Sequence, residues 1–369
     1  MKLTLENGDV FVGTAFGHPL RDDEFVLAEL VFCTGQSGYE EVLTDPSYFR
    51  QIVLMTFPLI GNTGINHHDA ESAHAYLSGL VVREVEEVPS HYRSQLSLPE
   101  YLREQRVPGL AGLDTRALTQ RLRTHGTLRA ALSGDQVTHD HLMAALSQPL
   151  PRDHVAQVST KVRQQHPSEG PHVAVIDYGC KRGIVRALLD RGCAVTVFPH
   201  DAAAPDVLAC HPDGVVLSNG PGDPSALAAD VSAVLPTIRA LQETAPLLGI
   251  CLGHQLFALA NGAATEKLHH GHRGCNRSVF DSETGQAAIA AHNHGYAVTA
   301  DSLAGSELRV TFRDLNDGCI EGLRHTRLPA WSVQFHPEAG PGPQDPRFLF
   351  DEFVRTLVSR RAALESTCR

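Results

Sequence analysis

The sequence predicts an α/β protein of two domains. Residues 1–150 are expected to form a smaller, strand-rich α+β domain, and residues 172–369 a doubly wound domain on a mostly parallel sheet. Short apolar segments separated by turn residues dominate the first part, which is typical of β-hairpins. Beyond about residue 171, strand-like apolar runs alternate with helical segments, which favours a parallel sheet covered on both faces. With 369 residues, 42% of them hydrophobic, the chain is long enough for two cores.

Composition argues against several classes of protein. The chain begins MKLTLENGDV, which turns polar and acidic at once, and no apolar run approaches the roughly 20 residues that cross a bilayer. Eight cysteines without a C-x-x-C pair argue against a disulfide framework and a zinc ribbon, and fit a reducing compartment. The formal charge of −11 offers no basic surface for nucleic acid. We therefore expect a cytoplasmic protein that binds neither nucleic acid nor membrane.

Turn signals organise the first domain. Two expected strands, Lys2–Leu5 and Val10–Ala15, are joined across Asn7-Gly8, a strong hairpin signal. Glycines and other turn residues are concentrated between apolar runs from Thr34 to Asn66, which indicates either a shaped surface or an ordinary loop-rich β segment.

The first domain is expected to end with a helix and a linker. The segment Leu113–Leu132 predicts an amphipathic helix, because Asp114 can cap it and Leu118 and Leu122 recur at helical spacing. From 151 to 171 the sequence is polar and punctuated by proline, without sustained periodicity, so we interpret it as the linker.

The second domain alternates strands with helices. The expected strands are His172–Asp177, Ala194–Pro199, Gly214–Ser218 and Leu247–Ile250, and the expected helices are Ile184–Arg191, Leu227–Leu241 and Leu252–Ala260. In sheets of this kind, active residues gather beyond the carboxyl ends of the strands. The segments that follow these strands are therefore where we look for a site.

Cys251 follows one of these strands in the stretch PLLGICLGHQ. The strand is followed by a Gly-x-Cys-x-Gly turn and then a helical run, which predicts a nucleophile elbow. Gly249 and Gly253 would leave room for the strained backbone of such a turn. A thiol at a helix start forms its thiolate more readily, so Cys251 is a candidate nucleophile. The alternative is a buried, inert cysteine beside a tight turn.

A histidine and a carboxylate follow the strand-like segment Trp331–Phe335. His336 and Glu338 are two residues apart, so an extended backbone would place both side chains on one face, and Pro337 would hold that geometry. A histidine near Cys251 could take its proton and return it to a leaving amine, while the carboxylate orients the imidazole. Taken alone, His-Pro-Glu is also common in solvated turns.

A glycine loop follows another expected strand. In SNGPGDP, Gly220 and Gly222 leave backbone N–H groups uncovered, and with the N–H of Leu252 they could form an oxyanion hole. A phosphate loop is the competing interpretation. Asp223 and the lack of lysine in the loop argue against it, and the chain has no G-x-x-x-x-G-K-[ST] motif.

A zinc site is a further interpretation of this sequence, because the chain has 21 histidines, and LHHGHRGCN brings His269, His270, His272 and Cys275 close together. The usual structural spacings are absent, and adjacent histidines on a glycine loop do not easily converge on one ion. We therefore expect no metal site.

Four motifs, GICLGHQ, SNGPGDP, AHNHGY and VQFHPEA, together resemble class I, or triad-type, glutamine amidotransferases over the second half of the chain. In the first half, GYEEVLTDPSY, FPLIGNTG and LDTRALTQRLR resemble the N-terminal domain of the small, glutamine-hydrolysing subunits of carbamoyl phosphate synthetase. The resemblance implies that Cys251 is the nucleophile, His336 the base and Glu338 its partner. It also implies a glutamine-binding set: Ser47, Gly220, Gly222, Leu252, Gln255, Asn293, Gly295 and Tyr296.

The resemblance also implies a function. Such a chain would hydrolyse L-glutamine and deliver ammonia to a large synthetase subunit, which makes carbamoyl phosphate from bicarbonate and ATP for pyrimidine and arginine biosynthesis. We expect no cofactor on this chain, and ATP and magnesium on the large subunit. A glutaminase subunit of another synthetase, or a γ-glutamyl hydrolase, would keep the triad but should lack the N-terminal block around Ser47. A regulatory pseudo-enzyme would lack a triad member.

Three positions depart from the family pattern. The family usually has phenylalanine where Tyr296 stands and glycine where Phe335 stands, and we expect glycine in place of Cys275. None of these changes removes a group that the chemistry uses, although Cys275 bears on the geometry of its loop.

Overall fold

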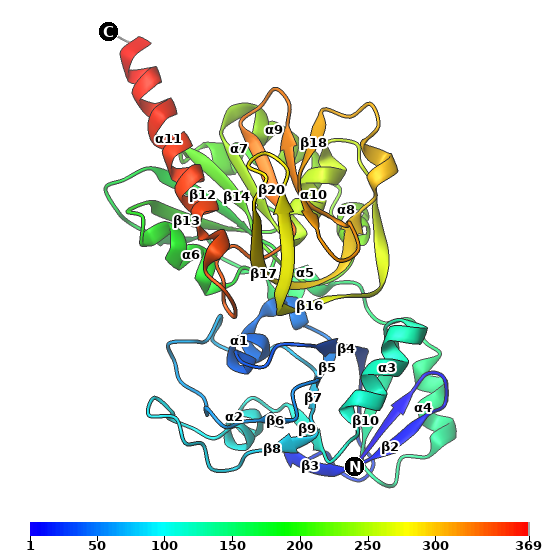
Figure 1. The fold of residues 1–369 in the computed structure, drawn as a ribbon. Helices are drawn as coiled ribbons and strands as arrows, with labels where there is room; N and C mark the ends of the chain where they lie inside the picture. Colours follow the sequence, from blue (N-terminus) through cyan, green and yellow to red (C-terminus); the bar gives the residue numbers. More distant parts are fainter. Residues whose placement is uncertain (368–369) are drawn as a thin grey trace. The chain divides into compact units, whose positions relative to one another are not determined.

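The structure, a computed structural model, describes residues 1–367 (Figure 1). Two compact units divide the chain. The first comprises Met1–Pro151 together with His269–Gly274, and the second Arg152–Leu268 together with Cys275–Arg369. The sequence did not indicate that a short segment from the second half belongs to the first unit.

An eight-stranded sheet forms the centre of the first unit, in the order β2-β1-β10-β4-β5-β7-β9-β3. Its strands are β1 (Lys2–Leu5), β2 (Val10–Val12), β3 (Thr14–Gly17), β4 (Phe25–Cys33), β5 (Gln51–Met55), β7 (Gly79–Val81), β9 (Pro108–Ala111) and β10 (Leu128–Ser133). A separate pair joins β6 (Leu59–Ile60) to β8 (Glu84–Val85). The helices are α1 (Tyr39–Thr44), α2 (Leu98–Glu104), α3 (Thr115–His125) and α4 (His139–Leu146).

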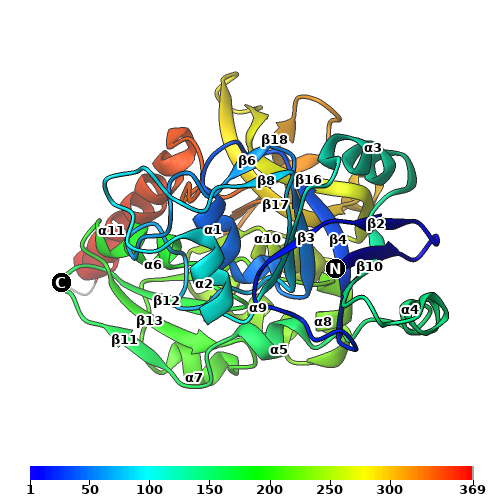
Figure 2. The same ribbon diagram turned by 90° about the horizontal axis from the view of Figure 1, so that it is seen from below.

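The predicted hairpin is present, but its second strand is split. β1 pairs antiparallel with β2 across the turn at Gly8, which has φ +89° (Figure 2). The expected strand Val10–Ala15 breaks at Gly13, beyond which β3 pairs with β9. A Cβ at Gly13 would lie 2.3 Å from the carbonyl oxygen of Ala111, so only glycine allows this close approach.

The expected helix Leu113–Leu132 is shorter than predicted. The Asp114 carboxylate caps α3 by accepting the N–H of Ala117 at 2.9 Å, and Leu118 is buried, as the sequence indicated. The helix ends at Gly126, whose φ of +87° favours glycine, and the chain continues as β10. Position 128 onward was therefore wrongly assigned to the helix.

A ten-stranded sheet forms the centre of the second unit, in the order β11-β13-β12-β14-β15-β20-β19-β18-β16-β17. Its strands are β11 (Gln164–His166), β12 (His172–Asp177), β13 (Ala194–Pro199), β14 (Gly214–Leu217), β15 (Leu247–Ile250), β16 (Thr265–Asp281), β17 (Ala287–Val298), β18 (Leu308–Asp314), β19 (Ile320–His325) and β20 (Ala330–Val333). Five neighbouring strands of this sheet are parallel: β13, β12, β14, β15 and β20. Beyond them, β19 pairs antiparallel with both β20 and β18. The predicted α/β class is confirmed.

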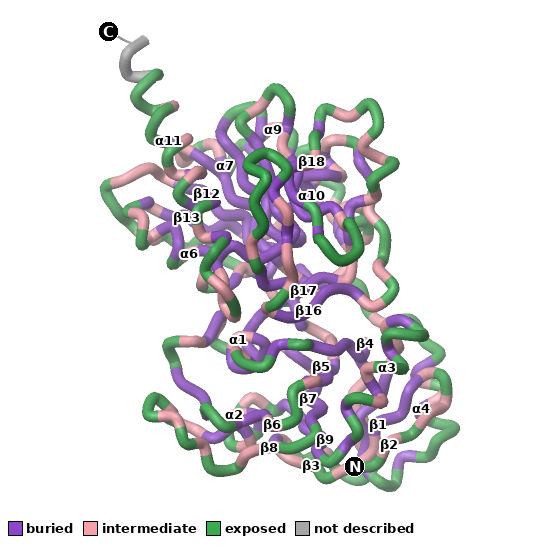
Figure 3. Tube along the Cα trace, viewed as in Figure 1, coloured by how far each residue is buried: buried purple, intermediate pink, exposed green. Residues whose placement is uncertain are grey.

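Helices cover both faces of this sheet. One core packs α6 (Arg182–Leu189) and α11 (Phe348–Thr367) against the strands. The opposite core packs α7 (Ala204–Leu208), α8 (Pro224–Asp230), α9 (Val234–Thr244) and α10 (Leu252–Ala260). The central strands between them are buried (Figure 3). No helix among the described residues has both the length and the apolar character that crossing a membrane requires.

Two sequence expectations for this unit need correction. The expected helix Leu227–Leu241 is two helices, because α8 starts earlier, at the cap Asp223, and stops at Asp230. The expected linker at 151–171 is structured: it contains α5 (His154–Val158), and β11 pairs antiparallel with β13 at the sheet edge. Polar composition concealed this edge strand, which has only one hydrogen-bonded neighbour.

Candidate active site

Cys251 lies at a sharp turn between β15 and α10. Its φ of +54° and ψ of −104° are strained values for a residue with a side chain. A Cβ at Gly249 would lie 2.7 Å from the carbonyl oxygen of Gly253, and a Cβ at Gly253 would lie 2.3 Å from that of Leu217. Glycine is therefore required on both sides of the cysteine, as a nucleophile elbow demands.

The Cys251 thiol is held inside the second unit. Its residue is 2% exposed, and its Sγ lies 3.6 Å from the backbone oxygen of Asn293 on β17. The backbone N–H of Cys251 donates to Val333 at the end of β20 at 2.9 Å. Cys251 is a free thiol. Its position at the carboxyl end of a parallel strand and at the start of a helix suits a nucleophile.

His336 and Glu338 form a buried hydrogen-bonded pair. The imidazole Nδ1 lies 2.6 Å from Oε1 of the carboxylate, and both side chains are almost fully buried. The expected extended backbone is wrong here, because β20 ends at Val333 and the N–H of Ala339 turns back to the oxygen of His336. A bridge from His336 to Ala291 on β17 fixes this turn.

Burial and charge act in opposite directions on this pair. Burial is the largest single influence on the pKa of His336 and lowers it, but Glu338 and Cys251 together outweigh burial and Lys181 and raise that pKa well above its ordinary value. Burial would raise the pKa of Glu338, but Lys181 and His336 hold it well below its usual range. Cys251 also raises the pKa of the imidazole, through its charge and a side-chain hydrogen bond, which falls to Nε2 because Nδ1 is engaged by Glu338. This nitrogen is the atom available for proton transfer.

Lys181 is the residue that sequence reasoning missed. Its Nζ lies 2.8 Å from Glu338 Oε1 and also donates to the backbone oxygen of Gly340. The lysine occupies the N-cap position of α6, without a side-chain capping hydrogen bond, four residues beyond the end of β12 at Asp177. Because active residues gather at such strand ends, this position carried a usable signal.

The glycine loop after β14 approaches the elbow closely. A Cβ at Gly220 would lie 2.1 Å from the oxygen of Tyr178 and 2.9 Å from a side-chain carbon of Leu252. Gly222 has φ +94°. Asp223 caps α8 by accepting the N–H of Ser225 at 2.8 Å, so its carboxylate has a structural task.

Other predicted glutamine-binding residues lie on α10 and β17. The Gln255 amide nitrogen donates to the oxygen of Tyr296 at 2.8 Å and to the side chain of Gln334 at 3.0 Å. Gln255 thus ties the elbow helix to the strand that carries Asn293 and Gly295. The structure brings these residues together in the second unit with Cys251.

Ser47 belongs to the first unit. It lies in the 3₁₀ helix Pro46–Tyr48, is 5% exposed, and its backbone N–H donates to Asp45 Oδ1 at 2.9 Å. Its predicted role in binding glutamine remains a prediction.

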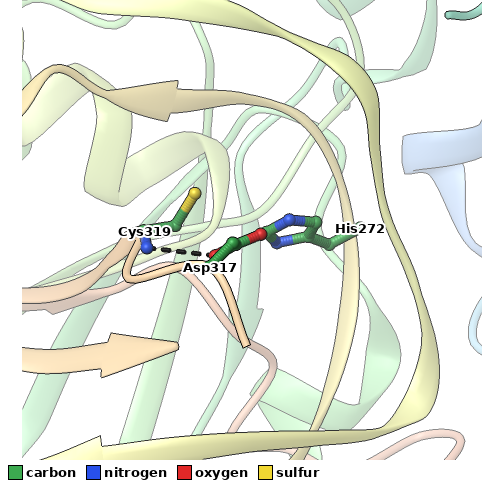
Figure 4. A group of neighbouring side chains, drawn as sticks. All are labelled: His272, Asp317 and Cys319. Atoms are coloured by element: carbon green, nitrogen blue, oxygen red, sulfur yellow. Dashed lines mark hydrogen bonds between the residues drawn. The ribbon is translucent and has the colours of Figure 1, made fainter. Parts of the chain in front are cut away.

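Two of the histidines considered for zinc, His269 and His270, have other hydrogen-bond partners. Nε2 of His269 pairs with the oxygen of Thr124 at 3.1 Å, and Nδ1 of His270 with that of Gly271 at 2.8 Å. Figure 4 shows Asp317 accepting the N–H of Cys319 at 3.1 Å. His272, drawn in the same view, belongs to the first unit.

One group within the second unit could hold a metal ion. Ligand atoms of His292, Asp314 and Glu321 all lie within 4.8 Å of one another. However, Arg277 Nε donates to Asp314 at 2.7 Å, and His292 Nε2 lies 3.0 Å from Glu321. These contacts engage one atom of each would-be ligand and place the Arg277 cation beside Asp314, so we interpret the group as a structural network.

Two family models match the chain. Residues 3–132 match the CPSase domain of the carbamoyl-phosphate synthase small chain, and residues 174–356 match glutamine amidotransferase class-I. Proteins named carbamoyl phosphate synthase small chain are similar over nearly the whole length. That of Listeria monocytogenes serotype 4b is 49% identical over 356 residues, covering 96% of each chain. That of Bacillus caldolyticus is 51% identical over 357 residues, again covering 96% of each, and that of Bacillus cereus is 46% identical over 368 residues, covering 100% of this chain and 99% of the relative. Because this similarity spans both units, the chain belongs to the carbamoyl phosphate synthase small chain family.

Proposed function

We propose that this chain hydrolyses L-glutamine at Cys251 and supplies the ammonia to a large synthetase subunit. The observation that carries the proposal is the strained Cys251 elbow in a unit that also holds the buried His336–Glu338 pair. The similarity to carbamoyl phosphate synthase small chains over 96% of the chain supports the synthetase assignment.

The reaction begins with the thiol. His336 takes the proton of Cys251, and the sulfur attacks the carbon of the glutamine carboxamide. The same histidine then returns the proton to the leaving nitrogen, and ammonia departs from a γ-glutamyl thioester. Water, activated by His336, hydrolyses the thioester and releases glutamate. Glu338 stabilises the imidazolium and fixes its orientation throughout.

Backbone N–H groups stabilise the charge that develops on the carboxamide oxygen. The first N–H groups of a helix have no partner within that helix, so the N–H of Leu252 at the start of α10 is suited to this task. The loop at Gly220 approaches the Leu252 side chain and supplies a second donor. Gln255, Asn293, Gly295 and Tyr296 of the second unit hold the substrate.

The ammonia is used outside this chain. The large subunit of carbamoyl phosphate synthetase would combine it with bicarbonate, with ATP and magnesium bound on that subunit, to make carbamoyl phosphate for pyrimidine and arginine biosynthesis. The chain has no P-loop sequence for such a nucleotide, and no cofactor is assigned to it. We place the reaction in the cytoplasm, which the free cysteines of the described residues support. The glycine-rich segment from Gly35 to Asn66 is our candidate for part of the docking surface.

The test compares the purified chain with the assembled complex. The chain is assayed with glutamine alone, and then with a large subunit, bicarbonate and ATP. We expect slow hydrolysis by the isolated chain, faster hydrolysis in the complex, and glutamine-dependent carbamoyl phosphate formation, because assembly completes the alignment of the site. Full-speed hydrolysis by the isolated chain would contradict the expected control by assembly. Absence of carbamoyl phosphate from a mixture that is active with ammonia would overturn the proposed function.

A further inference from the structure

Lys181 is a buried cation that the reaction scheme leaves without a role. Its side chain is 2% exposed, and its nearest charged partner is the fully buried Glu338 carboxylate at 2.8 Å. A buried ammonium costs several kcal/mol unless it is paired and hydrogen-bonded. This pairing joins two chain segments 157 residues apart, so its geometry depends on the folded sheet.

The lysine and the histidine share one carboxylate oxygen. Oε1 of Glu338 receives Lys181 Nζ at 2.8 Å and lies 2.6 Å from His336 Nδ1. Contacts from two sides fix the direction of the carboxylate and thereby the orientation of the imidazole. The three side chains therefore form one continuous chain of charges that ends at Nε2 of His336, the nitrogen that Glu338 does not engage.

The backbone around Lys181 is held in place. The N–H of Lys181 donates to Asn219 Oδ1 at 3.1 Å, in the glycine loop after β14. Asp177 Oδ1 accepts the N–H groups of Gly179 at 2.8 Å and Cys180 at 2.7 Å. Hydrogen bonds therefore hold the backbone of the turn at Gly179, at Cys180 and at Lys181 itself. Such support is expected for a side chain whose position matters.

We propose that Lys181 is a positioning residue of the glutamine-hydrolysing site, which keeps Glu338 ionised and directed at His336 and weakens the hold of this pair on its proton. The inference rests on the proposed function. The reason is one of charge. When the His336–Glu338 pair carries one proton it is neutral overall, and loss of that proton leaves a negative charge, which the ammonium of Lys181 stabilises. Gain of a second proton makes the pair positive, which the same ammonium opposes.

The charged groups around His336 agree with this direction. Glu338 and Cys251 raise the pKa of the imidazole, whereas Lys181 lowers it. Around Glu338, burial raises the pKa of the carboxyl, and Lys181 is the strongest of the influences that lower it. Removing the ammonium therefore shifts both proton equilibria of the pair to higher pH, whichever of its two members holds the shared proton.

The experiment uses the complex with the large subunit and compares Lys181→Met with Lys181→Arg. Glutamine-dependent kcat and KM are measured over the widest pH range in which the wild-type complex stays assembled, because the pKa of His336 lies well above that of an ordinary histidine. For Lys181→Met we expect both limbs of the pH profile to move upward by about one pH unit or more, with kcat at neutral pH reduced about 10- to 100-fold. Lys181→Arg keeps the positive charge, so its limbs should stay at the wild-type pH even if its rate is lower.

A double variant tests whether the lysine acts through the carboxylate. Lys181→Met combined with Glu338→Gln should lose no more activity than Glu338→Gln alone, because the lysine then has no carboxylate to position. The double variant also removes the charges of both Lys181 and Glu338. It therefore does not leave an ionised glutamate buried without a partner, which would destabilise the fold. The inference would be overturned if the limbs of the pH profile stayed at the wild-type pH in Lys181→Met. It would also be overturned if the activity losses of the two single variants multiplied in the double variant. If Lys181→Met does not assemble, the arginine variant and the double variant decide.

Ammonia-dependent synthesis separates this inference from the proposed function. That reaction bypasses the glutamine site, so every variant should retain it. A wild-type complex that uses ammonia but not glutamine would refute the proposed function and the inference with it. A wild-type complex that uses glutamine, with variants whose pH profiles do not change, would refute only the role of Lys181.

Discussion

Gly253 packs directly against the backbone of Leu217, and a Cβ at Gly253 would lie 2.3 Å from the Leu217 carbonyl oxygen. This contact joins the first turn of α10 to the end of β14, and it is reinforced by the Gly253 N–H, which donates to Ser218 at 3.0 Å. The strained Cys251 elbow depends on this approach, because the helix can begin beside the neighbouring strand only if position 253 has no side chain.

Replacing Gly253 with alanine should displace the elbow. We expect glutamine hydrolysis to fall at least about 100-fold and the protein to lose about 1–3 kcal/mol of unfolding free energy, because the methyl group must push the strand and helix apart. Steady-state kinetics and urea unfolding measure the two effects. Gly262→Asn, just beyond the same helix at φ +86° with open space around it, is the matched control and should change activity little. Equal activity of Gly253→Ala and this control would contradict the packing argument.

Cys251→Ser should abolish glutamine hydrolysis and leave ammonia-dependent synthesis intact. A serine hydroxyl in this site does not provide the thiolate that forms the acyl-enzyme. A glutamine-like electrophile followed by peptide mapping should label Cys251. Cys193 serves as an internal control, since burial raises the pKa of its thiol to about 11. Labelling mainly at any cysteine other than Cys251 would show that the nucleophile is misassigned.

Loss of His336 should cost far more activity than loss of Glu338. The imidazole transfers protons, a role worth about 10²–10⁴-fold, whereas the carboxylate orients it. The glutaminase rates of His336→Asn and Glu338→Gln, measured in the complex, give the comparison. Near-wild-type activity of the histidine variant would refute the assignment of the base.

The stability of the first unit should depend on pH through Glu40 on α1. Burial raises the pKa of this carboxyl from 4.5 to about 7, although its Oε2 accepts the backbone N–H of Asn66 at 2.9 Å. Because the folded pKa lies above the unfolded value, the stabilising contribution is present below about pH 4.5 and is lost as the pH rises through about 7. We expect a loss of about 1–2 kcal/mol between pH 5 and pH 8.

Glu40→Gln should remove this part of the pH dependence, because the amide does not titrate. Hydrogen exchange of the α1 amides at several pH values reports the local unfolding free energy. Glu104→Gln, an exposed position at the end of α2, is the matched control and should leave the wild-type slope unchanged. An identical slope in Glu40→Gln and wild type would rule out Glu40 as the cause.

Local sequence signals predicted much of the second unit. The bounds of β12, β13, β15 and α10 agree with the expected segments, because buried parallel strands and the helix after the elbow have strong apolar patterns. The Cys251 elbow and the meeting of His336 with Glu338 were also predictable, since each is a local motif. The extended backbone expected for the second motif was wrong, because a turn brings the two side chains together.

Features that depend on distant contacts escaped sequence reasoning. The partnership of Lys181 with Glu338 joins the loop after β12 to the turn that follows β20, although β14 and β15 lie between these two strands in the sheet. The end of α3 was missed because Leu128 continues an apolar pattern that serves equally in the strand β10. The apolar pattern alone does not distinguish a helix from a strand at these residues. The pairing of β10 with β1 and β4 makes them a strand.

The assignment of His269–Gly274 to the first unit bears on how the gene could be divided or recombined. The N–H groups of Thr34 and Thr127 donate to the backbone oxygens of Arg273 and His269, so a fragment that stops at Pro151 would lack these acceptors. If two relatives were recombined at a single crossover near Pro151, the chimera would have the first-unit sheet of one parent and the His269–Gly274 segment of the other. A working chimera should therefore need a double crossover that carries both stretches together.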